Sequence, residues 1–132
     1  MSLMLGTAGE HFVCFDCFMK GYTATIVNGQ VAFDVVLSVD GYVYKIQVKT
    51  STYSRCKGTS YLYALKYTKD MEIKGGYRRR DVDIFAFMSP KLKKVAYIPY
   101  DKITTNWKVT IQTSDYDLHS IDTAIDYLRT TF

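Results

Sequence analysis

The N-terminal part of the chain carries apolar residues at helical spacing. Between Leu5 and Lys20 these residues are Leu5, Ala8, Phe12, Phe15 and Met19, with a second row at Cys14 and Phe18. Because side chains three or four positions apart share one face of an α-helix, the spacing predicts a helix over residues 5–20. Its polar stripe consists of Gly9, Asp16 and Lys20.

Glu10 lies off this polar stripe, about one helical turn before Cys14. Residues three or four apart are neighbours on a helix, so this carboxylate is expected to point toward the sheet on which the helix packs. A solvated glutamate, or one favoured near the helix N-terminus by the helix dipole, is the alternative interpretation.

Two β-hairpins are predicted after the helix. The first joins strands at residues 22–27 and 31–39 through an Asn28-Gly29 turn. The second joins residues 31–39 to a strand at residues 42–50 through an Asp40-Gly41 turn. Asn-Gly and Asp-Gly are residue pairs that two-residue hairpin turns favour.

The second turn also predicts the register of its hairpin. Val39 faces Tyr42, and counting back along both strands places Asp34 opposite Gln47, with Lys49 on the same face. The other face is entirely apolar and consists of Phe33, Val35, Leu37, Val39, Tyr42, Tyr44, Ile46 and Val48. The hairpin therefore buries one face and collects polar side chains on the other.

Further strands and a second helix follow. Alternating patterns predict strands at residues 60–67, 82–88, 95–98 and 108–112, with a polar loop over 68–80 and a short turn or helix from Pro99 to Ile103. Ser120 is the expected N-cap of a C-terminal helix whose apolar face consists of Ile121, Ala124, Ile125 and Leu128. Strands and helices are thus combined in an α/β (α+β) fold.

The composition is that of an ordinary globular domain. The chain has 132 residues, of which 48% are hydrophobic and 23% are charged. A typical domain has about 100–200 residues, so residues 1–132 are expected to form a single domain. No stretch approaches the roughly 18 consecutive apolar residues of a membrane helix, and the first basic residue, Lys20, comes too late for a signal peptide. We therefore expect a cytoplasmic protein without a membrane segment.

Three cysteines allow two interpretations. Cys14 and Cys17 form a C-x-x-C pair that could bind zinc together with His11 or Cys56. Both nevertheless lie in an apolar helical run, and no second C-x-x-C or paired histidine is present. Reduced cysteines of the hydrophobic core are the favoured interpretation.

Positive charge is concentrated in the middle of the chain. Residues 45–94 contain 13 of the 17 lysines and arginines but only four of the 13 acidic residues. Interleaved tyrosines make this segment suited to a phosphate backbone, although a solvated basic face with tyrosines packed on a sheet is the alternative. Lys74, Arg78, Arg79 and Arg80 belong to the loop that is expected to contact DNA.

Short motifs in the chain resemble those of the PD-(D/E)XK nuclease superfamily. They are Gly6-Thr-Ala-Gly-Glu10, Phe33-Asp34, Ile46-Gln-Val-Lys-Thr50, the segment from Tyr77 to Phe87, and Tyr97-Ile-Pro99. With Gln47 at the second acidic position, they resemble the variant that includes small homing endonucleases and Holliday-junction-resolvase-like proteins. The resemblance implies a restriction-endonuclease-like core, with a central mixed sheet, mainly antiparallel, flanked by helices.

The same resemblance implies that Glu10, Asp34, Gln47 and Lys49 are catalytic residues. Phosphodiester cleavage needs a hard cation to stabilise phosphate charge and to activate water. Oxygen atoms of Glu10, Asp34, Gln47 and the Val48 carbonyl would hold Mg²⁺, with Mn²⁺ as the alternative ion. Because Gln47 is neutral, Glu10 is needed as the second carboxylate. Lys49 would orient water or stabilise the pentavalent phosphate.

A metal-dependent DNA endonuclease of the sequence-specific homing or restriction type is therefore the predicted function. One alternative is a structure-specific nuclease for Holliday junctions or other branched DNA. The other is an inactive DNA-binding module of the same fold, which the neutral Gln47 keeps open. Cutting both strands of double-stranded DNA with one site per chain requires two copies, so a homodimer or higher homo-oligomer is expected.

Overall fold

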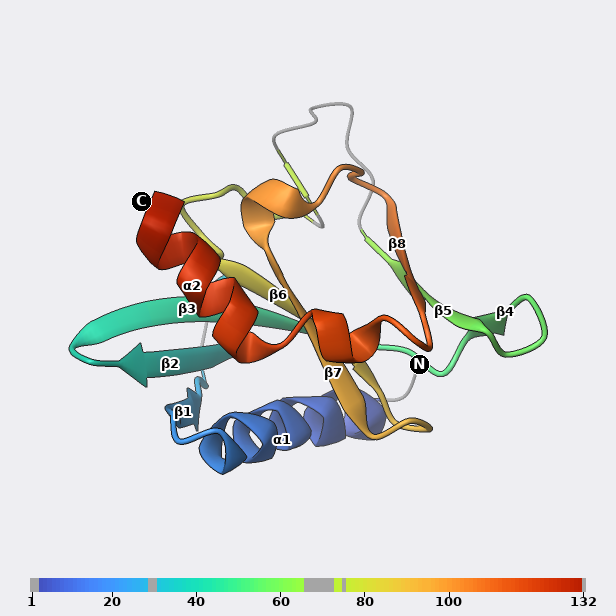
Figure 1. Ribbon diagram of the computed structural model, residues 1–132, viewed down its shortest axis with the longest axis horizontal. Coiled ribbons are helices and arrows are strands. Elements are labelled where there is room, and N and C mark those ends of the chain that lie inside the picture. Colours follow the sequence, from blue (N-terminus) through green and yellow to red (C-terminus); the bar gives the residue numbers. More distant parts are fainter. Residues whose placement is uncertain (1–2, 29–30, 66–72, 75, 132) are drawn as a thin grey trace.

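A five-stranded mixed sheet forms the centre of the computed structural model, which describes residues 3–28, 31–65, 73–74 and 76–131 (Figure 1). Its spatial order is β1-β2-β3-β6-β7. The strands are β1 (Thr23–Ile26), β2 (Val35–Val39), β3 (Tyr42–Thr50), β6 (Ile84–Ser89) and β7 (Lys94–Pro99). β3 and β6 pair in parallel, and the other neighbours in this order are antiparallel. The expected mixed, mainly antiparallel sheet is confirmed.

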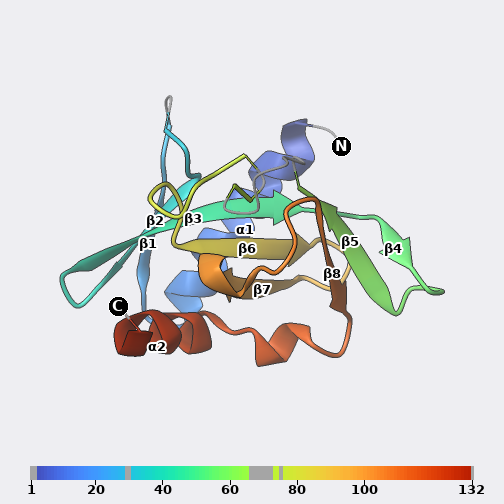
Figure 2. The same cartoon turned by 90° about the horizontal axis from the view of Figure 1, so that it is seen from above.

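A smaller antiparallel sheet lies beyond the C-terminal end of β3 (Figures 1 and 2). Its order is β4-β5-β8, and its strands are β4 (Ser54–Arg55), β5 (Ser60–Ala64) and β8 (Lys108–Gln112). Two helices, α1 (Leu3–Met19) and α2 (Ile121–Thr131), and two 3₁₀ turns, η1 (Tyr100–Lys102) and η2 (Tyr116–Leu118), complete the described part of the chain.

The central sheet is buried on both faces by two different sets of side chains. One core joins the sheet to both helices, and it includes Val48 of β3, Val13 of α1 and Ile125 of α2. The other core lies on the opposite face, where Phe85 and Phe87 of β6 pack with the tyrosines of the smaller sheet. Successive residues of a strand point to opposite faces, so β3 and β6 supply both cores in alternation.

The structure confirms where several of the predicted elements begin or end. The Asp40-Gly41 hairpin pairs Val39 with Tyr42 as expected. β8 and η1 lie where the sequence places them, and α2 begins after Ser120, whose Oγ accepts the Thr123 N–H at 3.1 Å. Such an N-cap satisfies one of the helix's unpaired amide donors.

Other boundaries differ from the prediction. β2 begins at Val35 instead of residue 31, so residues 27–34 separate it from β1, and the Val27 N–H donates to the Asp34 carbonyl at 2.9 Å. Gly29 of the predicted turn, residues 66–67 of the predicted strand and residues 68–72 of the predicted loop lie outside the described residues. The sequence did not predict β4, which is only two residues long, or η2.

The cysteines of α1 belong to the hydrophobic core. Cys17 is fully buried, and Cys14 packs against the same cluster. Burial raises the pKa of the Cys17 thiol to about 12, which opposes thiolate formation. Within the described residues, no group of three or more His, Cys, Asp or Glu side chains could hold a metal ion. The burial of Cys17 agrees with the interpretation of core cysteines. No helix among those residues is both long and apolar enough to cross a membrane.

α1 and β3 approach each other closely at Gly9. Gly9 is buried, although the sequence pattern assigned it to the polar stripe of the helix. A Cβ atom built on Gly9 would lie 1.9 Å from the Oγ1 atom of Thr50, whereas one on Gly6 would meet nothing within 4 Å. The missing side chain therefore lets the helix lie directly on β3, with Glu10 at the next position.

We predict opposite effects for alanine at these two glycines. Gly6→Ala should raise the free energy of unfolding by about 0.5–1 kcal/mol through helix propensity. Gly9→Ala should lower it by about 1–3 kcal/mol, because the new methyl group collides with Thr50. Urea denaturation of the two variants measures both values.

Removing the obstructing side chain provides the control for Gly9. In a Thr50→Ala background, Gly9→Ala should lower the free energy of unfolding much less than in the wild type, because the Oγ1 atom is gone. An equal cost in both backgrounds would contradict the collision as the reason for glycine at this position.

Candidate active site

The Asp34 carboxylate is anchored to the central strand. The backbone N–H of Asp34 donates to the Ile46 carbonyl at 2.9 Å. The Oδ2 atom of the Asp34 carboxylate accepts the Val48 N–H at 3.0 Å. The regular ladder between β2 and β3 ends at the pair Val35 and Ile46. Asp34 therefore lies one residue beyond the ladder and not in the regular pair with Gln47 that the sequence predicts.

Gln47 and Lys49 lie on β3 beside the aromatic residues of β6. In the parallel register Gln47 pairs with Phe85 and Lys49 with Phe87. Gln47 is only 7% exposed, and the Lys49 ammonium lies 5.7 Å from the centre of the Tyr77 ring. Both polar side chains are thus held in a largely apolar environment, where their own mobility and their hydration are reduced.

Asp34 and Lys49 influence each other electrostatically. Burial lowers the pKa of Lys49, and the negative charge of Asp34 opposes this shift. Burial raises the pKa of Asp34, whereas the hydrogen bond from the Val48 N–H and the positive charge of Lys49 lower it. Each group is therefore partly desolvated and partly compensated by the other.

Glu10 reaches the same region from α1. Burial, followed by the negative charge of Asp34, raises its pKa, while the nearby His11 acts in the opposite direction. Two carboxylates from separate elements consequently share one electrostatic environment. The helix brings Glu10 toward the sheet, in agreement with the direction expected from the sequence pattern.

The donor set at this place suits a hard cation. The Asp34 charge disfavours ionisation of Glu10, and Gln47 is a nearly buried amide on β3, one residue before Val48, whose N–H the Asp34 carboxylate accepts. Oxygen donors of this kind are those that Mg²⁺ binds, and a dication would relieve the repulsion between the two carboxylates.

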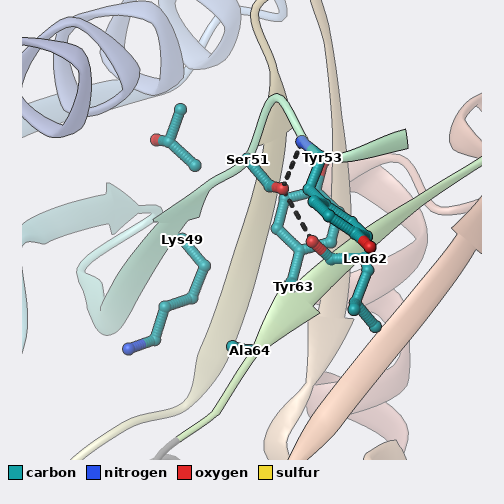
Figure 3. A pocket seen from close by; sticks show the side chains of 7 residues that line it. Lys49, Ser51, Tyr53, Leu62, Tyr63 and Ala64 are labelled. Atoms are coloured by element: carbon teal, nitrogen blue, oxygen red, sulfur yellow. Dashed lines mark hydrogen bonds between the residues drawn. The ribbon is translucent and has the colours of Figure 1, made fainter. Parts of the chain in front are cut away.

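A pocket of about 360 Å³ opens beside Lys49 (Figure 3). Its wall includes Leu62 and Ala64 of β5, together with Tyr53 from the segment after β3. Ser51 Oγ donates to the Leu62 carbonyl at 2.6 Å and accepts the Tyr53 N–H at 3.0 Å. These bonds hold the backbone of Tyr53, whose side chain is 62% exposed, against β5.

Sequence reasoning did not find this pocket. Ser51 and Tyr53 follow the catalytic-type motif directly, but their partner Leu62 comes from the smaller sheet. Only the packing of β5 beside the end of β3 creates the wall, and no local pattern encodes that packing. An exposed aromatic residue close after the motif was the one available signal.

The basic residues of the predicted DNA-contacting loop have different environments. Arg79 forms an ion pair with Asp83 at 2.7 Å and lies 3.5 Å from Asp101. Arg78 and Arg80 are exposed. The Asp83 carboxylate also accepts the Lys45 N–H at 2.7 Å, which indicates a structural role for this residue.

Lys74 is directed to the protein and not outward. Its ammonium donates to the Tyr100 carbonyl at 3.0 Å and lies 4.7 Å from the centre of the Tyr100 ring. Burial lowers its pKa, against the charge of Asp101. Arg78 and Arg80 are thus the more exposed side chains of this group, and Arg80 lies 3.7 Å from Asp81.

Comparisons with known proteins identify the family and the fold of the chain. A family model described as PD-(D/E)XK endonuclease matches residues 3–129. The bacterial homing endonuclease I-Ssp6803I has a TM-score of 0.75 to this structure at 16% identity, with 96% of this chain and 93% of that chain covered. Hjc, a Holliday junction resolvase from Archaeoglobus fulgidus, has a TM-score of 0.55 at 20% identity, with 90% and 94% covered. The chain has no match among the curated proteins.

We predict that Glu10→Gln stabilises the metal-free protein at neutral pH. Because the folded-state pKa of Glu10 is raised above 4.5, its contribution to stability is present below that pH and is lost as the pH rises through the folded pKa. The variant should therefore have the larger free energy of unfolding at pH 7 in EDTA, and its advantage should shrink below pH 4.5. Urea denaturation at several pH values measures this.

The carboxylate pair is tested by a double-mutant cycle. If Asp34 contributes to the raised pKa, Glu10→Gln should stabilise the protein less in an Asp34→Asn background. An equal increase in the free energy of unfolding in both backgrounds would show that burial alone raises the pKa of Glu10.

Proposed function

The chain belongs to the PD-(D/E)XK endonuclease family, and from this premise we propose that it cleaves double-stranded DNA at a specific sequence with the help of Mg²⁺. The observation that carries the proposal is that the Asp34 carboxylate acts electrostatically both on Glu10 of α1 and on Lys49 of β3. The similarity of this fold to that of a homing endonuclease supports the proposal of a nuclease that acts on DNA.

The residues proposed to hold the ion are Glu10, Asp34, Gln47 and the backbone carbonyl of Val48. When bound there, Mg²⁺ or Mn²⁺ would stabilise the charge that develops on the phosphate and would lower the pKa of an attacking water. The Val48 N–H fixes the Asp34 carboxylate through the 3.0 Å hydrogen bond, so this ligand is already oriented. Preorganised ligands of this kind reduce the cost of assembling the site.

Lys49 is proposed to act on the reacting phosphate. Its burial and its position beside Asp34 hold the side chain in place, and its lowered pKa makes the ammonium a better proton donor than an exposed lysine. It would donate a hydrogen bond to the phosphate or orient the attacking water. The pocket next to Lys49 provides room for the nucleotide that adjoins the cut.

Cleavage of double-stranded DNA has consequences for the oligomeric state and the cellular location of the protein. Each chain carries one candidate site, so cutting both strands of a duplex calls for a homodimer or a higher homo-oligomer. A cytoplasmic location gives access to DNA and to a reducing environment, which suits the three free cysteines of the described residues.

The decisive experiment is incubation of the protein with supercoiled plasmid and with a synthetic four-way junction, each with Mg²⁺ and with EDTA. Plasmid cleavage that requires Mg²⁺ supports the proposal. Selective cleavage of the junction would favour a branched-DNA nuclease instead, and binding without cleavage of either substrate would favour an inactive DNA-binding module.

We predict that Lys49→Met abolishes cleavage while DNA affinity is largely retained. The rate should fall at least about 100-fold, because a positioned charge at the reacting phosphate is removed. Lys45→Met is the matched control, since Lys45 lies on the same strand and bonds to the Arg80 carbonyl. Single-turnover cleavage and filter binding measure the two properties, and a normal cleavage rate for Lys49→Met would remove Lys49 from the mechanism.

The two exposed arginines are predicted to bind phosphates. Arg78→Ala/Arg80→Ala should weaken DNA binding and should flatten the slope of log K against log salt by about 0.9 for each phosphate that is no longer neutralised. Arg79→Ala should change the slope less, because its guanidinium is paired with Asp83. An unchanged slope in the double variant would show that this loop faces away from the DNA.

A further inference from the structure

The pocket beside Lys49 combines a positive charge with apolar walls. Lys49 is the one charged residue among the described residues that line it. Tyr61 and Tyr63 of β5 are buried in the core. Leu62 and Ala64 alternate with these tyrosines, so their side chains lie on the other side of the strand and line the pocket. An ammonium group and an apolar surface are therefore offered to the same ligand.

Tyr53 adds an aromatic ring to this pocket. The residue is 62% exposed, yet its backbone is fixed from two directions. The Tyr53 N–H donates to Ser51 Oγ at 3.0 Å (Figure 3), and the Tyr53 carbonyl accepts the Leu62 N–H at 3.0 Å. The Ser51 N–H donates to the Met88 carbonyl of β6 at 3.2 Å. The segment after β3 is thus tied to both sheets, and it presents the ring at the surface instead of burying it.

The combination of these groups matches the chemistry of a nucleotide. A nucleotide joins a phosphate anion to a flat base, and proteins that bind single-stranded DNA stack such bases on aromatic side chains beside a positively charged groove. The pocket volume of about 360 Å³ lies in the range of about 300–1,000 Å³ that is typical of small-ligand sites. None of the described lining residues is acidic, so no carboxylate there repels a phosphate.

The spacing of Lys49 and Tyr53 also fits one DNA strand. An extended chain advances by at most about 3.6 Å per residue, so the backbones of these two residues lie within about 14 Å of each other. Successive nucleotides of a strand are about 3.4 Å apart along the duplex axis. A phosphate at Lys49 therefore places a base of the same strand, no more than a few nucleotides away, within reach of the Tyr53 ring.

We propose that the pocket beside Lys49 holds a DNA base that has left the duplex, stacked on the ring of Tyr53. The inference rests on the proposed function and deepens it, because it specifies how the strand is held next to the cut. Bases of a duplex are paired and stacked, and extruding one is easiest where the base is mismatched or already single-stranded. The pocket therefore selects DNA with an unpaired base near the reacting phosphate.

Two single strands of equal length that differ only in their bases test the proposal. One is oligothymidylate, and the other has the same phosphates with an abasic sugar at every position. Fluorescence anisotropy in EDTA measures binding without cleavage. The wild type should bind oligothymidylate about 5- to 100-fold more tightly than the abasic strand, which is the effect of stacking one base on an aromatic side chain.

Variants of Tyr53 assign this preference to its ring. Tyr53→Ala should lose most of the preference for oligothymidylate and should keep its affinity for the abasic strand, with an unchanged salt dependence, because no phosphate contact is removed. Tyr53→Phe keeps the ring and should keep the preference. Tyr42→Ala is the matched control, since Tyr42 is 65% exposed at the opposite end of β3. It should behave as the wild type, and circular dichroism checks that each variant is folded.

A duplex with one central mismatch tests the extrusion of a base. In EDTA the wild type should bind this duplex more tightly than the fully paired duplex, and Tyr53→Ala should remove the difference. Equal binding of the two duplexes by the wild type would overturn extrusion.

The results that would overturn the stacking site are equally defined. A wild type without a preference for oligothymidylate, whether it binds both strands or neither, would contradict the proposal, as would a Tyr53→Ala variant that retains the preference. These measurements involve no metal and no cleavage. A Mg²⁺-dependent nuclease without the preference would contradict only this inference, and an inactive protein with the preference would contradict only the proposed cleavage.

Discussion

The alternation of side chains along β3 is the constraint on which the rest of this structure depends. Ile46 and Val48 point into the core shared with the helices, so Gln47 and Lys49 must point to the other face, beside Phe85 and Phe87. A period of two leaves no other choice once one face is buried. The strand therefore serves the hydrophobic core and the candidate site at once, and a slip of one residue would destroy both.

This arrangement places polar groups where folding alone would not favour them. Burying an amide or an ammonium costs free energy unless partners compensate, and here Asp34 compensates Lys49 only in part. Glu10 adds a second negative charge beside Asp34. Local conflict of this kind is expected at functional sites, where stability is exchanged for a preorganised set of charges. A dication bound as proposed would offset the repulsion between the carboxylates, which is the physical link between the electrostatics of the site and the proposed chemistry.

Sequence reasoning succeeded where the signal is local and failed where it depends on residues far apart in the chain. The Asp40-Gly41 turn was enough to predict the ends of β3 and its pairing with β2, and Ser120 marked the start of α2. The ion pair of Arg79 with Asp101, the pocket wall at Leu62 and the burial of Gly9 depend on elements that meet only in the folded chain. Asp34 departs from regular pairing because the strand ladder ends one residue earlier, and a residue pattern does not reveal where a ladder ends.

The helix α1 shows why an apolar pattern needs a structure before it can be interpreted. Its apolar rows predicted a helix correctly, but Phe15 and Phe18 face outward while Gly9, Val13 and Cys17 face the sheet. The inner side of the helix had to be small at Gly9 so that Glu10 could approach Asp34. An outer side free of charges is then unexplained by the fold of one chain, because solvent-facing helix positions are usually polar. The side of α1 that faces the sheet is thus accounted for by its packing on β3 and by the approach of Glu10 to Asp34.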